Sequence, residues 1–216
     1  MTIDAQLEQP ALAAVGIRKR YGRRLALDAV SLWVAAGEVV ALVGENGSGK
    51  TTLLRICAGV LRPDAGDVAV AGRVGYCPQR PALLDLLNAD EHLALFGAAL
   101  GVSAHDAVAE GRQVLAELRF PVGDPTRAGE LSGGSRQKLN LALAVFGDPP
   151  VLLLDEPYQG FDQGSYVSFW EHVSHWRAQG KAIIIVTHVL PDSRLVDRVV
   201  ELSLPTFAIA MGGERR

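Results

Sequence analysis

Three glycines and a lysine–threonine pair, close together early in the chain, have the plainest chemical capability. They stand in segment 44–52, Gly-Glu-Asn-Gly-Ser-Gly-Lys-Thr-Thr, which fits the pattern G-x-x-x-x-G-K-[ST]. Glycines let the backbone curl so that successive N–H groups point inward, and a following helix N-terminus adds positive potential. Polyphosphate suits that geometry. Lys50 would reach the outer phosphates, and the Thr51 hydroxyl would contact Mg²⁺.

The flanking segments decide between a phosphate-binding loop and an ordinary glycine-rich turn. Residues 39–43 are apolar and rich in β-branched side chains, which is typical of a buried strand. Apolar spacing after Lys50 predicts a helix that ends at Gly59. The motif requires a strand before it and a helix after it, so we interpret 44–52 as a nucleotide-binding loop.

Two carboxylates close a second apolar run. Residues 151–154 are Val-Leu-Leu-Leu, and Asp155 and Glu156 follow them. A strand that is apolar on both faces is typical of a parallel sheet, whose carboxyl edge carries the ligand crevice. Asp155 is suited to hold Mg²⁺ through its water shell, and Glu156 to take a proton from water. The alternative is an Asp-Glu turn that merely ends a core strand.

Three single residues would have a functional role only if they lie beside such a nucleotide site. Tyr21 lies in a turn-rich segment and is either a surface residue or a platform on which adenine stacks. Gln79 is either a solvated loop residue or a contact to Mg²⁺ or the attacking water. His188 follows the apolar run 182–186 and is either an ordinary histidine at a strand end or a sensor of the terminal phosphate.

A second glycine-rich helix start occurs at 131–135, Leu-Ser-Gly-Gly-Ser, before an apolar helix predicted over 136–146. Serine is a favoured helix cap, and glycines leave no Cβ in the first turn. A phosphate of another molecule could therefore approach these N–H groups closely.

The elements that must position these residues alternate between strand and helix, which predicts an α/β fold. Strands are expected at 14–19, 29–34, 67–70 and 74–76, with one or two more within 199–209. A helix is expected over 165–179. Residues 82–120 interrupt this order with amphipathic helices at 90–96 and 106–120, an inserted helical block in which His92 and His105 are expected on solvated faces.

Composition narrows the class of protein. The 216 residues carry a net charge of −3, so no basic field favours nucleic acid. Cys57 and Cys77 lack metal-ligand spacing and are expected to be buried thiols in a reducing compartment. No signal peptide and no apolar run of about 20 residues is present. We expect a soluble protein whose membrane role, if any, needs a partner.

These motifs in this order resemble the nucleotide-binding subunit of ATP-binding-cassette (ABC) transporters. The glycine-rich loop 44–52 corresponds to the motif called Walker A, which many families share. Leu-Ser-Gly-Gly between Gln79 and the Asp155–Glu156 pair is specific to this family. The resemblance implies one domain over 1–216. Its P-loop NTPase core of mixed or parallel sheet has an N-terminal antiparallel β subdomain and an inserted α-helical subdomain at about 82–140.

The resemblance also assigns roles, with ATP and Mg²⁺ as the cofactors. ATP is expected to contact Tyr21, Gly44, Glu45, Asn46, Gly47, Ser48, Gly49, Lys50, Thr51, Thr52, Ser132, Gly133, Gly134 and Asp162. The metal is expected near Thr51, Gln79 and Asp155. The residues expected to act in hydrolysis are Glu156, His188, Lys50 and Gln79.

The partners implied are a second cassette and a separate transmembrane permease. Two cassettes, identical or different, would sandwich two ATP molecules so that Walker A of one faces Leu-Ser-Gly-Gly of the other. The protein is then expected to be cytoplasmic, held through the permease on the inner face of the cell membrane. The short C-terminus favours export over import. The first stretch of the helical block, 81–87, carries more leucine than one helix face can bury. These leucines either form the contact with the permease or all pack inside the block.

Other classes fit less well. A non-transport ABC ATPase of DNA repair would carry coiled-coil or zinc insertions, and none is evident. A GTPase would carry Asn-Lys-x-Asp, and a small-molecule kinase would not need Leu-Ser-Gly-Gly. A regulatory module that binds ATP without hydrolysis would not need Glu156 and His188.

Overall fold

The computed structural model describes residues 10–187 and 194–204. Its first sheet holds β1 (Leu12–Tyr21), β2 (Arg24–Val34) and β4 (Ala65–Val70), which pair antiparallel in the order β2-β1-β4. The strands predicted at 14–19 and 29–34 are therefore longer than expected and form one hairpin. This confirms the expected N-terminal antiparallel sheet.

The second sheet has the order β5-β6-β7-β3-β8, and its pairs are parallel. Its strands are β3 (Val39–Val43), β5 (Val74–Cys77), β6 (Val151–Asp155), β7 (Ala182–Val186) and β8 (Arg198–Glu201). Of the one or two strands predicted within 199–209, the described residues contain β8, which ends at Glu201, and residues 205–209 lie outside the described residues.

The parallel strands are apolar throughout because both faces are covered. Along β3, Val39 and Ala41 pack into one core cluster and Val40 and Leu42 into another. Side chains alternate between the faces of a strand, so a continuous apolar run serves two cores. One core lies against the helices of the inserted block and those that follow it, and the other lies toward α1 (Lys50–Cys57) and the antiparallel sheet.

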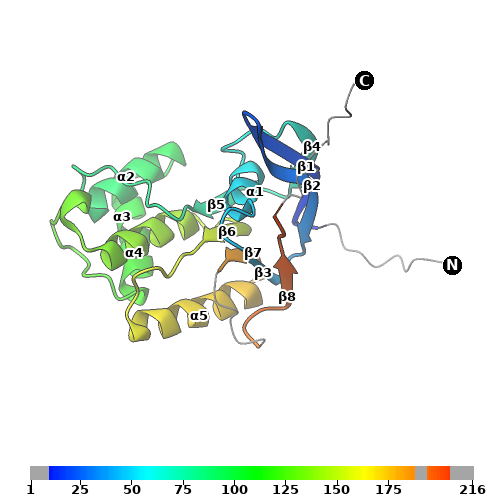
Figure 1. The fold of residues 1–216 in the computed structure, drawn as a ribbon. Helices are drawn as coiled ribbons and strands as arrows, with labels where there is room; N and C mark the ends of the chain where they lie inside the picture. Colours follow the sequence, from blue (N-terminus) through cyan, green and yellow to red (C-terminus); the bar gives the residue numbers. More distant parts are fainter. Residues whose placement is uncertain (1–9, 188–193, 205–216) are drawn as a thin grey trace, which may run out of the picture.

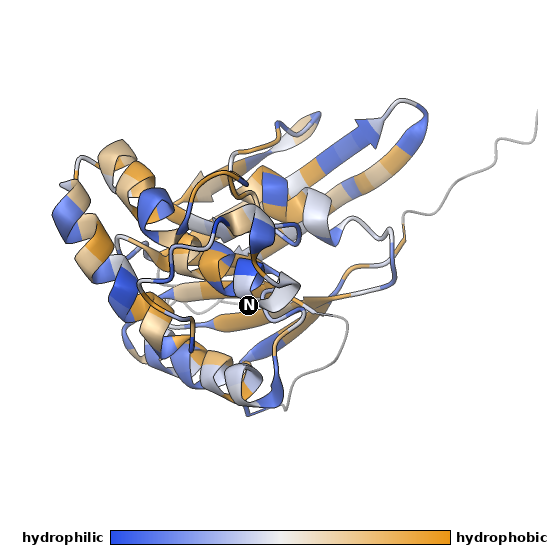
Figure 2. Ribbon diagram, turned by 90° about the vertical axis from the view of Figure 1, so that its left-hand side faces the viewer, coloured by the Kyte–Doolittle hydropathy of each residue, from blue (hydrophilic) through white to orange (hydrophobic). Residues whose placement is uncertain are grey.

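Four further helices and a short 3-10 turn complete the described chain. They are α2 (Ala89–Ala99), α3 (Ala104–Glu117), the turn η1 (Ala128–Glu130), α4 (Gly133–Val145) and α5 (Gln163–Ala178). Figure 1 shows α2, α3 and α4 on the opposite side of the parallel strands from the antiparallel sheet. In Figure 2 the central strands are mainly orange, whereas the outer helices carry blue and orange segments side by side.

The expectation that His92 lies on a solvated face is wrong. His92 is 1% exposed, and its Nε2 accepts a hydrogen bond of 2.9 Å from the Leu84 N–H. Its Nδ1 lies 2.7 Å from the carbonyl oxygen of Asn88. The ring fixes the stretch before α2 to the helix, a contact that helical periodicity does not reveal. His105 is exposed, as expected.

Candidate functional site

The glycine-rich loop joins β3 to α1 and is shaped by a left-handed residue. Gly49, at the N-cap of α1, has φ of 103°, and a Cβ there would lie 2.6 Å from the Ala26 carbonyl oxygen. A residue with a side chain would meet both a conformational and a steric penalty. Glycine at this position lets the loop pass close to Ala26 and Leu27 of β2.

Lys50 begins the helix and reaches back over the loop. Its Nζ donates to the carbonyl oxygens of Gly44 at 2.7 Å and Glu45 at 3.0 Å, and the side chain is 6% exposed. The ammonium is therefore held at the loop by neutral acceptors. An arriving phosphate would supply an anionic acceptor, and charge-assisted hydrogen bonds of that kind are the stronger ones.

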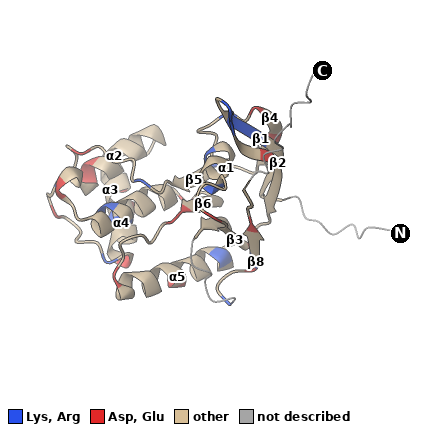
Figure 3. Cartoon of the chain, viewed as in Figure 1, with Lys and Arg blue, Asp and Glu red and all other residues tan. Residues whose placement is uncertain are grey.

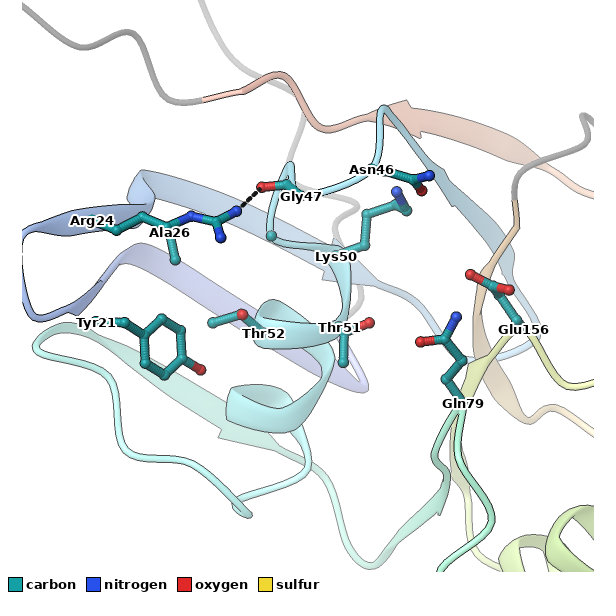
Figure 4. Close-up of a pocket in the computed structure, with 11 residues that line it drawn as sticks. Tyr21, Arg24, Ala26, Asn46, Gly47, Lys50, Thr51, Thr52, Gln79 and Glu156 are labelled. Atoms are coloured by element: carbon teal, nitrogen blue, oxygen red, sulfur yellow. Dashed lines mark hydrogen bonds between the residues drawn. The ribbon is translucent and has the colours of Figure 1, made fainter.

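A cavity of about 240 Å³ lies above the loop. Figure 4 shows Lys50, Gln79 and Glu156 converging at one end of it and Tyr21 at the other. An aromatic ring at one end and a cluster of polar groups at the other suit a ligand with a base and a polyphosphate. The residues that line the cavity are Tyr21, Arg24, Ala26, Asn46, Gly47, Gly49, Lys50, Thr51, Thr52, Gln79 and Glu156.

Asp155 lies deeper, at the end of β6, and is fully buried. Among the described residues, no group satisfies either carboxylate oxygen with regular hydrogen-bond geometry. Burial raises the pKa of Asp155, and the nearby Thr51 hydroxyl opposes that shift. A buried carboxylate with orphaned oxygens beside a hydroxyl fits a hard cation such as Mg²⁺, which prefers oxygen ligands.

Glu156 follows in a left-handed backbone conformation, with φ of 50°. Its N–H donates to the Val186 carbonyl oxygen on β7 at 3.1 Å, which fixes the peptide at the carboxyl edge of the sheet. Such a conformation costs a non-glycine residue about 1–3 kcal/mol and persists where the surroundings enforce it. The turn directs the Glu156 side chain into the cavity while Asp155 stays beneath it.

Comparison with known proteins identifies the family of the chain. Residues 27–159 match the protein family described as "ABC transporter". The chain belongs to the ABC transporter family.

Two curated members and one solved member illustrate the relationship. "Nod factor export ATP-binding protein I" of Burkholderia lata is 37% identical over 196 residues, which cover 85% of this chain and 64% of that protein. The protein of the same name from Rhizobium sp. (strain N33) is 34% identical, over 91% of this chain and 69% of its own length. A solved "ATP binding subunit of ABC transporter" is 28% identical with a TM-score of 0.81, covering 90% of this chain and 88% of that one.

The chain therefore spans about two thirds of the length of these curated relatives. The fold prediction is confirmed, because the solved cassette matches 90% of this chain with a TM-score of 0.81. None of the helices within 10–187 and 194–204 combines the length and apolar character needed to cross a membrane.

The structure brings most of the predicted ATP residues of this cassette together. Gly44, Glu45 and Ser48 belong to the same loop as the residues that line the cavity, and buried Ser48 Oγ has no hydrogen-bond partner in the part of the chain that the structure describes. His188 lies outside the described residues. Sequence reasoning missed Arg24 and Ala26, although both follow Tyr21 closely; the turn gave no sign that β2 would run over the loop.

Three of the residues predicted to contact ATP, Ser132, Gly133 and Asp162, do not line this cavity. Ser132 caps α4 by accepting from the Ser135 N–H, and Ser132 and Gly133 are exposed and do not line the cavity. Asp162 caps α5 through Ser165, and those hydrogen bonds lower the pKa of Asp162 to about 2. Within a single subunit, these residues therefore lie apart from the cavity that the glycine-rich loop forms.

Proposed function

We propose that this chain is the ATP-hydrolysing subunit of an ABC transporter that exports its cargo through a separate membrane permease. The observation that carries the proposal is the cavity, where Tyr21, the glycine-rich loop, Gln79 and Glu156 meet above buried Asp155. We also propose that 1–216 forms a single ATPase domain with the helical block at about 82–140 inserted in it.

Hydrolysis of ATP would be an in-line attack of water on the terminal phosphate. Lys50 and the inward N–H groups of the loop hold the phosphates and stabilise the charge that develops on them. Glu156 orients the water and accepts its proton, and Gln79 lies across the same end of the cavity (Figure 4). His188 is proposed to sense the terminal phosphate.

Mg²⁺ would be held by the Thr51 hydroxyl, by Gln79 and, through water, by Asp155. When bound, the ion neutralises charge on the β- and γ-phosphates. Asp155 is 0% exposed and interacts with Thr51, which lines the cavity, so it would act on the ion without meeting bulk water.

The test is release of phosphate from Mg-ATP by the purified protein and by its Glu156→Gln variant. Loss of a general base lowers the rate of a catalysed reaction by about 10²- to 10⁴-fold. The variant should therefore bind ATP but hydrolyse almost none of it. Turnover within a few-fold of the parent would remove Glu156 from that role. ATP binding without hydrolysis by the parent would favour a regulatory ATP-binding module instead.

We propose further that two copies, or this chain and a similar cassette, share their sites. Ser132 caps α4, which begins with Gly133 and Gly134, and a Cβ on Gly133 would meet no atom of the described residues within 4 Å. The packing of the described residues therefore does not require glycine at this position. Gly133 suits a phosphate carried by the facing subunit, which approaches the first turn of α4 from outside.

The permease would dock on the helical block. Leu84 is 53% exposed and Leu86 is 75% exposed, just after Gln79. Leu87 is half-buried and donates its N–H to Leu84, so it belongs to the fold of the stretch. Apolar side chains beside the loop that carries Gln79 suit a contact that responds to the terminal phosphate. The protein would then lie at the inner face of the membrane.

The named relatives support export, since both are described as Nod factor export proteins. The cargo would be recognised by the permease. Mixed charge over the surface favours a protein partner over nucleic acid: Figure 3 shows Lys and Arg interspersed with Asp and Glu, and the net charge is −3.

The docking proposal is tested by co-purification of the permease from detergent extracts. Leu86→Asp should abolish co-purification while ATP hydrolysis by the isolated subunit remains. Val167→Asp is the matched control, because Val167 is 51% exposed on α5, away from this stretch. Retained co-purification with Leu86→Asp would place the contact elsewhere.

A further inference from the structure

Three segments meet on the inner face of α4. The first is the end of β5 with Cys77 and Pro78, immediately before Gln79. The second is the helix itself, which contributes two buried amides, Gln137 and Asn140. These residues are three positions apart and so lie on one face of the helix. The third is the backbone of Glu156.

Asn140 joins α4 to the loop that carries Gln79. Its Nδ2 donates to the Pro78 carbonyl oxygen at 2.8 Å and to Cys77 Sγ at 3.2 Å. Because a carbonyl oxygen only accepts, the nitrogen of the Asn140 amide is the atom that faces it. Cys77 is fully buried, and burial raises the pKa of its thiol, so the sulfur meeting this amide is uncharged.

Gln137 joins the same helix to Glu156. Its Nε2 donates to the Glu156 carbonyl oxygen at 3.3 Å, and its Oε1 lies 3.4 Å from Asn140 Nδ2. The Glu156 oxygen also accepts from the Gln159 N–H at 3.2 Å. The left-handed peptide of Glu156 is therefore held by β7 through its N–H and by α4 and the next turn through its carbonyl.

The start of the helix touches the same turn. A Cβ on Gly134 would lie 2.5 Å from the Gly160 carbonyl oxygen, so the backbone of α4 packs directly on the segment after Glu156. A regular helix of 13 residues moves as a unit, and its exposed end is the proposed contact for the facing subunit's nucleotide. A displacement of that end would reach Gln137 and Asn140 directly.

We propose that Gln137 and Asn140 are positioning residues that set the distance between Gln79 and Glu156 in the cavity, and that they couple both to the start of α4. This inference rests on the proposed ATPase function for its catalytic consequence. Its structural part, that Asn140 holds the Gln79 loop, is independent of activity. Gln137 is 2% exposed and Asn140 5% exposed, so water cannot replace a lost partner readily.

The experiment compares Asn140→Leu, which keeps similar volume without donors, with the parent. Asn140→Ala serves as a second variant in case the leucine does not fit. Ser168→Ala is the matched control, because Ser168 is also buried and also donates a hydrogen bond from a helix, to the Glu117 carbonyl oxygen at 3.1 Å. Thermal unfolding establishes that each variant is folded.

Hydrogen–deuterium exchange of peptides covering 76–81 and 155–161 is the first readout. In Asn140→Leu, exchange at 76–81 should rise at least tenfold, while exchange at 44–52 and throughout Ser168→Ala stays at parental rates. The second readout is ATP hydrolysis. Small misplacements of reacting groups lower the reaction rate by up to about 100-fold. We therefore expect kcat of Asn140→Leu to fall about 10- to 100-fold, while its KM for ATP stays within threefold of the parental value.

Unchanged exchange at 76–81 in a folded variant would overturn the positioning role. Increased exchange with parental kcat would overturn the catalytic consequence. A change of the same size in Ser168→Ala would mean that any lost buried hydrogen bond has this effect, and would also overturn the proposal. If the parent itself does not hydrolyse ATP, the proposed function fails, while the exchange measurement still decides whether Asn140 holds the loop.

Discussion

Two glycine-rich helix starts lie in this molecule, and they differ in what surrounds them. At the start of α1, Gly49 is enclosed by β2, and Lys50 is buried against the loop. At the start of α4, Gly133 faces open space and Ser132 is exposed. Both present backbone N–H groups suited to phosphate. The start of α1 belongs to a cavity that one chain forms by itself. We infer that the start of α4 contacts a phosphate bound to a second chain.

The largest contrast should come from adding one methyl group at each start. Gly49→Ala requires a side chain at φ of 103° and 2.6 Å from the Ala26 carbonyl oxygen, so ATP binding should fall by more than about 100-fold. A Cβ at Gly133 would meet no atom of residues 10–187 and 194–204 within 4 Å, so Gly133→Ala should bind ATP as the parent does. Fluorescent-nucleotide titration measures both, with thermal unfolding as the control. Equal binding by the two variants would contradict the contrast.

Mixing two inactive variants tests whether the open start serves another subunit. Lys50→Ala disables the loop, and Gly133→Asp places a negative charge where the facing phosphate would arrive. Gly133 is preferable to Gly134, which packs on Gly160 within its own chain. Each variant alone should be inactive. A random mixture should recover roughly a quarter of parental phosphate release if the two sites act independently, since half the dimers carry one intact site.

The mixing result is read beside the dependence of parental activity on protein concentration. Activity per subunit should rise with concentration as dimers form. If the specific activity of the parent does not change with protein concentration and the mixed variants recover no activity, the shared-site model is wrong. Full activity of Gly133→Asp alone would contradict it as well.

A smaller effect is expected at the other end of the enclosed cavity. Stacking of a base on an aromatic ring contributes about 1–3 kcal/mol, so Tyr21→Ala should raise KM for ATP by about 5- to 150-fold. Because Tyr21 is 49% exposed, the lower part of that range is expected. The maximal rate should stay near the parental value, since stacking is the same in ground and transition states. An unchanged KM would make Tyr21 a plain surface residue.

The smallest effect concerns the stability of the enclosed site. Burial raises the pKa of Asp155 above 3.8, so the folded state binds its proton more tightly than the unfolded state does. Stability from this group is complete below 3.8 and falls as pH rises through the raised value. Asp155→Asn lacks the penalty of a buried charge. Its Tm in metal-free buffer at pH 7 should exceed the parental Tm, by roughly 2–4 °C for each kcal/mol.

The difference in Tm should shrink when the pH is lowered below the ordinary carboxyl range. Addition of Mg-ATP should raise the parental Tm more than that of the variant, because the ion would compensate the buried carboxylate. A lower Tm for Asp155→Asn at neutral pH would show that the carboxylate already stabilises the fold without metal.

Local patterns predicted much of the fold and of the site. The loop 44–52, the apolar strand before Asp155 and the helix starting near Ser132 depend on neighbouring residues alone, and the structure places them as expected. The burial of His92 was not predictable in this way. Its partner is the N–H of Leu84, and no periodicity in α2 shows that a stretch before the helix folds back over it.

The sequence by itself determined the chemistry available: a lysine and N–H groups for phosphate, two adjacent carboxylates after an apolar strand, and apolar runs that must be buried on both faces. Only the tertiary structure decided which groups share a cavity. It brought Arg24 over the loop, set Asn140 against Pro78 and left Gly133 open. The physical reason is distance along the chain. Hydrogen bonds such as Asn140 to Pro78 join residues far apart in sequence, and they form only when sheet order and helix packing bring them together.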